Sequence, residues 1–176
     1  MTGFGRLPIM RSLALVVLLV TAHVAHADAL KVGDRLAELD VAVDANGKAF
    51  KLKSVPGWRL VTVGASWCKP CAKELPTWDK LAPEFKGKVS FVAVNIDDEI
   101  DDGKKFNKKL KLANLKLVYL PADKSAVVAK YGSDNMPTTF IADPQGVVRY
   151  VRAGFEKGDT SGELKKMREQ LTKLVK

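Results

Sequence analysis

The segment VTVGASWCKPCAKELP, residues 61–76, decides how the rest of the chain is interpreted. It begins within a short apolar run rich in β-branched residues, 60–63, which is typical of a buried strand. Small residues at 64–66 then lead to Cys68 and Cys71, where a helical pattern begins. The order predicts a buried strand that turns sharply into a helix whose start carries a cysteine pair.

This setting predicts a reactive thiol. A sulfur at the first turn of a helix faces unpaired backbone N–H groups and the positive end of the helix dipole. Such cysteines have pKa values lowered to roughly 3.5–7.5, against about 8.5 for a free thiol. We therefore expect Cys68 to be the attacking nucleophile and Cys71 the resolving thiol. Lys69 adds positive charge that favours the thiolate, whereas Pro70 has no N–H to offer it, so the two residues tune the redox potential in opposite directions.

A structural disulfide and a metal clip are the alternatives. A disulfide that closes so short a loop stabilises by only about 2 kcal/mol. A metal site usually needs about four protein ligands, and the only histidines, His23 and His26, lie in the N-terminal leader. We expect no metal and no cofactor other than the redox-active disulfide. Two thiolates alone could hold Cu(I), so a non-catalytic binding module or Cu(I) carrier stays open.

The same residues resemble a known family. Trp-Cys-x-Pro-Cys followed by Glu-x-Pro is similar to the thioredoxin superfamily, and the spacing of Cys71, Glu74 and Pro76 is closest to its exported TlpA/ResA-like branch. The resemblance covers about residues 30–175. It implies an α/β, thioredoxin-like fold, in which a central mixed β-sheet is flanked by helices and preceded by an added N-terminal β-hairpin. We place that hairpin at 40–52, with Asn46-Gly47 supplying the positive φ angles of its turn.

The resemblance also implies roles for residues around the cysteines. Glu74 would be a buried acid that relays protons to or from Cys71, the alternative being a surface glutamate. One departure matters here: thioredoxins carry a buried aspartate where this chain has Thr62, which leaves Glu74 as the sole acid expected nearby.

Three further residues would bind the client. The resemblance makes Pro137 a cis-proline opposite the cysteines. The backbone of Met136 would pair with an extended client segment, and its side chain would contact the disulfide. Trp67 would shield one side of the disulfide, although plain core packing is an equal explanation for it.

These implications give a thiol-disulfide oxidoreductase that exchanges disulfides with client proteins. The resemblance favours a reductase, with cytochrome c maturation as one such role and a membrane thiol-disulfide protein as electron donor. An oxidase or isomerase with the same residues is the main alternative. A thiol peroxidase would need a threonine-rich loop around a lone cysteine, which 66–68 does not provide. We expect a monomer.

The first 27 residues have the features of a signal peptide. Arg6 and Arg11 precede an apolar stretch at 13–20, and Ala25-His26-Ala27 has the small-x-small form of a cleavage site. We predict a signal peptide at 1–27, one thioredoxin-like domain at 28–176, and a periplasmic or secreted location. The alternative is an uncleaved membrane anchor, but the stretch is shorter than the approximately 20 residues that span a bilayer.

Charge and spacing in the remaining chain point to ordinary helices. The net charge is +9, or +7 after loss of the leader, with a lysine-rich run at 104–111. The run contains a single aromatic residue, Phe106, and no recognisable nucleic-acid-binding motif, so we interpret it as a solvated helix face and expect no nucleic-acid partner. The acidic cluster at 97–102 predicts the start of that helix. Thr160 and Glu163 predict a capping box for a final helix, along which Leu164, Met167, Leu171 and Leu174 recur at helical spacing.

Overall fold

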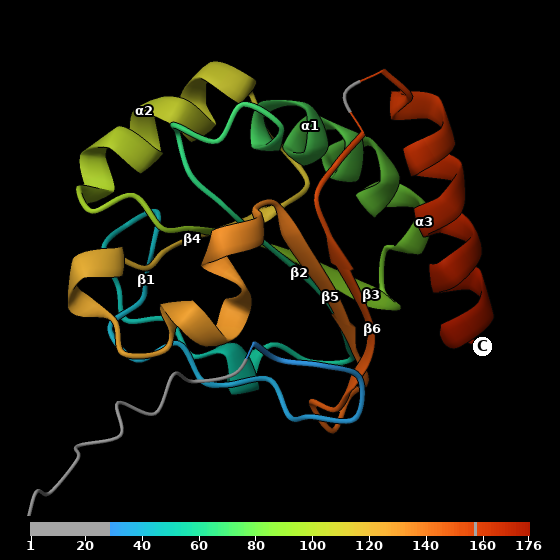
Figure 1. Ribbon diagram of the computed structural model, residues 1–176. Helices are drawn as coiled ribbons and strands as arrows, with labels where there is room; N and C mark the ends of the chain where they lie inside the picture. The colour runs from blue at the N-terminus through green and yellow to red at the C-terminus, as the bar shows by residue number, and fades with distance from the viewer. Residues whose placement is uncertain (1–28, 157) are drawn as a thin grey trace, which may run out of the picture.

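The computed structural model describes residues 29–156 and 158–176, which form a six-stranded mixed sheet with helices packed along it (Figure 1). The predicted signal peptide lies outside the described residues. The strands are β1 Val43–Asp44, β2 Trp58–Gly64, β3 Val89–Asn95, β4 Lys116–Tyr119, β5 Thr138–Ala142 and β6 Val148–Ala153, in the spatial order β1-β4-β3-β2-β5-β6. The helices are α1 Cys71–Leu81, α2 Ile100–Leu110 and α3 Thr160–Leu174. None of these helices is long and apolar enough to cross a membrane.

The centre of the sheet is built from β2 and β3, which are parallel and almost wholly buried. Their nearly continuous apolar sequences suit strands that are covered on both faces. Helix α1 connects β2 to β3, and α2 connects β3 to β4, which is also parallel. Because both crossovers advance in the same direction and such crossovers are right-handed, α1 and α2 lie on the same face. Figure 1 shows α3 beside α1 on that face.

Two apolar clusters fill the two sides of the sheet. On the helical side, side chains of α1 and α3 pack onto the central strands, with Trp78, Leu81, Met167 and Leu171 among the most buried. On the other side, the N-terminal segment and the 3₁₀ turns between β4 and β5 supply Leu39, Phe50, Leu52 and Tyr131. The N-terminal segment is therefore an integral cover of the sheet.

The expected N-terminal hairpin is present only in a short form. Val43 forms an isolated bridge with Ala49, and the Gly47 N–H donates to the Asp44 carbonyl. Gly47 has a positive φ of 79°, but Asn46 does not, so the prediction that both turn residues take positive φ was wrong. The strand β1 also pairs with β4, which makes it the edge of the main sheet.

The capping box predicted for α3 is wrong as well. The cap is Asp159, whose carboxylate accepts a hydrogen bond from the Gly162 N–H at 2.8 Å. Glu163 does not reach back to the cap, since its side chain is buried and forms an ion pair with Arg152 of β6. Glu163 therefore pairs with a residue of the sheet, Arg152, and not with the cap to which the local sequence pattern assigned it.

Candidate active site

The cysteine pair lies where β2 ends and α1 begins. Residues 65–70 form the turn between them, and Cys68 and Cys71 are joined by a disulfide. Cys68 is 5% exposed and Cys71 is completely buried. The two sulfurs therefore differ in access, because only Cys68 presents any surface to solvent.

The helix begins at Cys71, later than the sequence pattern indicated, with Pro70 at the cap position. Cys68 precedes the helix, and its N–H donates to the Ala65 carbonyl. The Cys71 N–H, the first of the helix, points at the Cys68 sulfur with an N–Sγ distance of 3.3 Å. A donor at the positive end of a helix stabilises negative charge on the atom that it faces, so this geometry favours a thiolate at Cys68 after reduction.

Gly64, the last residue of β2, makes room for the resolving sulfur. A β-carbon at this position would lie 2.9 Å from the Cys71 sulfur and 3.1 Å from the Cys71 β-carbon. A larger residue would therefore push against the disulfide. The backbone of β2 thus packs directly against the cysteine pair.

Glu74, three residues after Cys71 in α1, is only 1% exposed, which rules out a surface glutamate. Its two carboxyl oxygens contact Thr62 Oγ1 at 2.6 Å and Thr139 Oγ1 at 2.7 Å. The Trp78 indole donates to Thr139 Oγ1 at 3.3 Å. Burial raises the pKa of Glu74, although the hydrogen bonds from the threonines and the charge of Arg152 act to lower it. The effect of burial is the larger one, so the neutral form of Glu74 is favoured more in the folded protein than it would be in water.

A second buried acid near the cysteines was missed from the sequence. Asp97 is 5% exposed and follows β3, and its carboxylate accepts hydrogen bonds from Ser66 N–H, Ser66 Oγ and the Asn95 amide. Glu74 is therefore not the sole acid near the pair. The available signal was Asn95 at the end of a buried strand with Asp97 two residues later, but Asp97 was assigned to the acidic start of α2. Through these hydrogen bonds, Asp97 fixes the position of Ser66 in the turn, two residues before Cys68.

The remaining predicted residues lie at the same end of the sheet. The Met136–Pro137 peptide bond is cis, as the resemblance implied, and it immediately precedes β5. Thr138 pairs with Val63, so Pro137 lies beside the end of β2 from which the cysteine turn departs. Met136 is half-buried against the apolar cluster on the non-helical side. Trp67 is 65% exposed, which excludes core packing as its role.

Lys69 and Pro70 occupy the two positions between the cysteines. Lys69 is exposed and Pro70 is half-buried at the cap of α1. The structure thus brings together, at one end of the sheet, the residues predicted from the sequence, which are Trp67, Cys68, Lys69, Pro70, Cys71, Glu74, Met136 and Pro137.

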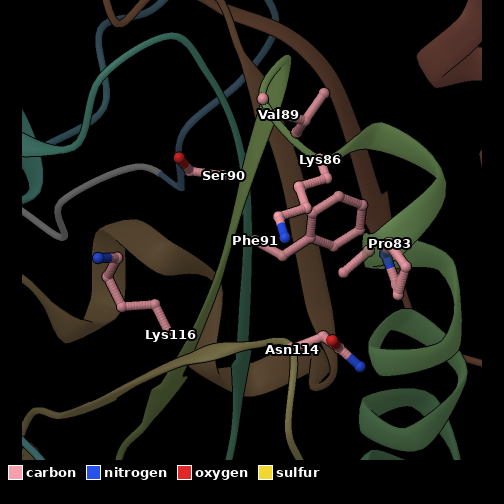
Figure 2. Close-up of a pocket in the computed structure, with 9 residues that line it drawn as sticks. Pro83, Lys86, Val89, Ser90, Phe91, Asn114 and Lys116 are labelled. Carbon is pink, nitrogen blue, oxygen red and sulfur yellow. The ribbon is translucent and has the colours of Figure 1, made fainter.

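The pocket in Figure 2 lies elsewhere, between the end of α1 and the start of β3. It is lined by Pro83, Lys86, Phe91, Asn114 and Lys116 among others, and has a volume of about 370 Å³. Neither cysteine belongs to it. Within the described residues, no group of three or more histidine, cysteine or acidic side chains is arranged to hold a metal ion.

Comparisons with known proteins agree with this geometry. The model of the AhpC/TSA family matches residues 32–151. The thioredoxin-like protein YneN of Bacillus subtilis (strain 168) is 32% identical over 110 residues, which are 62% of this chain and 64% of YneN, slightly less than two thirds of that relative. The thiol-disulfide oxidoreductase ResA of Bacillus thuringiensis (strain Al Hakam) is 31% identical over 130 residues, which are 72% of this chain and 73% of ResA.

A solved structure shares the fold. It is a DsbE thiol:disulfide interchange protein from Chlorobium tepidum, which is 26% identical and superimposes with a TM-score of 0.66 over 81% of this chain and 99% of that one. The chain therefore belongs to the AhpC/TSA family, and it is a thioredoxin-like thiol-disulfide oxidoreductase of the ResA type.

Proposed function

We propose that the protein is an exported thiol-disulfide reductase of client proteins, in which Cys68 attacks, Cys71 resolves and Glu74 moves the proton. The observation that carries the proposal is the 3.3 Å approach of the first N–H of α1 to the Cys68 sulfur. This donor makes Cys68 the better nucleophile and the better leaving group of the two sulfurs.

The proposed reaction has two steps. The Cys68 thiolate attacks a client disulfide, forms a mixed disulfide, and releases one client sulfur as a thiolate. Cys71 then gives its proton to the Glu74 carboxylate and attacks the Cys68 sulfur, which breaks the mixed disulfide and releases the second client sulfur. Because Cys71 is completely buried, external thiols cannot reach it, and resolution proceeds within the protein.

The surface around Cys68 supports a protein client. Trp67 exposes 65% of its surface next to Cys68, although large aromatic side chains usually bury most of theirs. Met136 and Pro137 lie at the neighbouring strand start, where an extended client segment would align with the backbone. The exposed indole and this strand start would hold the client on either side of the disulfide. Lys69 and Pro70 would tune the redox potential.

The biological setting is part of the proposal. We place the protein in the periplasm, acting as a monomer on clients such as apocytochromes c and receiving electrons from a membrane thiol-disulfide donor. The signal-like leader and the similarity to ResA support this setting. The direction of exchange is tested by the reduction potential, since a value near about −270 mV is typical of a reductase and one near about −120 mV of an oxidase.

Covalent trapping tests the chemistry. Cys71→Ser should accumulate mixed disulfides with clients through Cys68, because the resolving sulfur is missing. Cys68→Ser is the matched control and should trap nothing. Captured apocytochromes would support the proposed clients, whereas the absence of any adduct would refute the exchange mechanism. A stable stoichiometric Cu(I) complex without disulfide reductase activity would instead select the Cu(I) carrier.

A further inference from the structure

Two buried threonines face each other across the central strands. Thr62 of β2 pairs with Thr139 of β5 in the sheet register, and both are at most 1% exposed. Their side chains point to the helical side, where Glu74 of α1 lies over them. Buried hydroxyl groups cost free energy unless they are hydrogen-bonded, so their partners define what they do.

The two hydroxyls and the carboxyl group form a closed ring. Thr62 Oγ1 lies 2.6 Å from Glu74 Oε2, Thr139 Oγ1 lies 2.7 Å from Glu74 Oε1, and the two hydroxyl oxygens are 3.1 Å apart. All three contacts are within hydrogen-bond distance. The Trp78 indole donates to Thr139 Oγ1 from outside the ring.

Counting protons shows that the ring accepts both states of the acid. When Glu74 is neutral, it donates to Thr139, Thr139 donates to Thr62, and Thr62 donates to the other carboxyl oxygen. When Glu74 is ionised, Thr62 still donates to its carboxylate oxygen, and the Thr139 hydroxyl rotates from Thr62 to donate to the other carboxylate oxygen. The change needs one hydroxyl rotation, that of Thr139, and no movement of the backbone.

We propose that Thr62 and Thr139 are positioning residues that make Glu74 a reversible proton store for Cys71. The inference rests on the proposed function. As Cys71 resolves a mixed disulfide, its proton passes to the Glu74 carboxylate, the Cys68–Cys71 bond forms, and the bond from Cys68 to the client breaks with the electron pair leaving on the client sulfur. In the reverse direction, the Cys71 thiolate released on reduction takes the proton back.

The threonines act mainly on the ionised form of the acid. A carboxylate buried in this apolar helical interface is costly, and two hydroxyl donors reduce that cost. Without one of them, Glu74 would stay neutral to higher pH and could not accept the proton of Cys71. The other charged groups facing this site are Arg152 of β6, paired with Glu163 of α3, and they remain in place in a threonine variant.

A two-phase thiol assay tests the inference with the probe 5,5′-dithiobis(2-nitrobenzoate) and the fully reduced protein. The attack of Cys68 releases the first coloured thiolate, and the resolution by Cys71 releases the second. Thr62→Val should leave the first phase unchanged. It should raise the pH midpoint of the second phase by about one pH unit, since a hydrogen bond to a charged group is lost. Thr62→Ser should restore the midpoint, and Thr139→Val provides an independent test on the neighbouring strand.

The background Glu74→Gln distinguishes a positioning role from a structural one. Glutamine mimics the neutral acid, so Thr62→Val should cause no further shift in this background. An unshifted midpoint in both valine variants would overturn the inference, as would an equal shift in the glutamine background. Loss of the first phase in the unmodified protein would refute the proposed function itself, and the inference with it.

Discussion

Glu74→Gln should remove a pH dependence from the stability of the oxidised protein. Glu74 is 1% exposed, and burial raises its pKa above the ordinary value of 4.5 that it regains on unfolding. Between these two values, the folded protein keeps a proton that the unfolded chain has released. Because the folded state then binds more protons, the free energy of unfolding falls as the pH rises through this window.

One proton sets the size of the effect. Its full contribution to the slope is about 1.4 kcal/mol per pH unit, from pH 4.5 upward until the buried carboxyl group itself ionises. Glutamine cannot ionise, yet it preserves the ring, since its amide donates to Thr139 and its carbonyl accepts from Thr62 over the 2.7 and 2.6 Å contacts. The variant should therefore match the original protein at low pH and exceed its stability increasingly at higher pH.

Urea unfolding of the two oxidised proteins at a series of pH values measures this difference. All other carboxyl groups contribute equally to both curves and cancel. The matched control is Glu169→Gln, which removes the same charge from an exposed position of α3. Its curve should run parallel to that of the original protein. Parallel curves for Glu74→Gln as well would show that Glu74 is already ionised in the folded state and would refute the reasoning.

Three further substitutions probe the surroundings of the cysteines. Gly64→Ala should raise the reduction potential, measured in equilibrium with glutathione, by about 20–60 mV. The new β-carbon would lie 2.9 Å from the Cys71 sulfur, which destabilises the disulfide, whereas the free thiol of the reduced protein can turn away. An unchanged potential would contradict this. Gly103→Ala should lower the free energy of unfolding by about 1–3 kcal/mol in urea, because its β-carbon would lie 2.1 Å from the Asn95 side chain that binds Asp97; a gain in stability would show that Asn95 moves freely. Trp67→Ala should change the free energy of unfolding by less than about 0.5 kcal/mol, since the side chain is 65% exposed. The same variant should slow the reduction of a protein disulfide more than the reduction of a small-molecule disulfide. Equal slowing of both would argue against a role of Trp67 in docking the client protein.

The sequence by itself determined the features that arise from neighbours along the chain. The apolar run at 60–63 identified β2, and the cysteine spacing placed a redox pair at the start of the helix that follows it. The turn at 143–146 is also local: Asp143, Pro144 and Gly146 suit the first, second and fourth positions of a type I turn, and the Gly146 N–H donates to the Asp143 carbonyl. Each of these depends on residues close in sequence, whose side chains and backbone limit the local conformation directly.

The tertiary structure alone decided which polar groups are buried and what they bind. Thr139 reaches Glu74 across 65 residues, and only the β2–β5 register brings it beside Thr62. The side chain of Glu163, predicted to cap α3, instead forms a buried ion pair with Arg152 of β6. Burial of a polar side chain is tolerated only where distant strands and helices supply a partner, and such partners are set by packing rather than by local spacing.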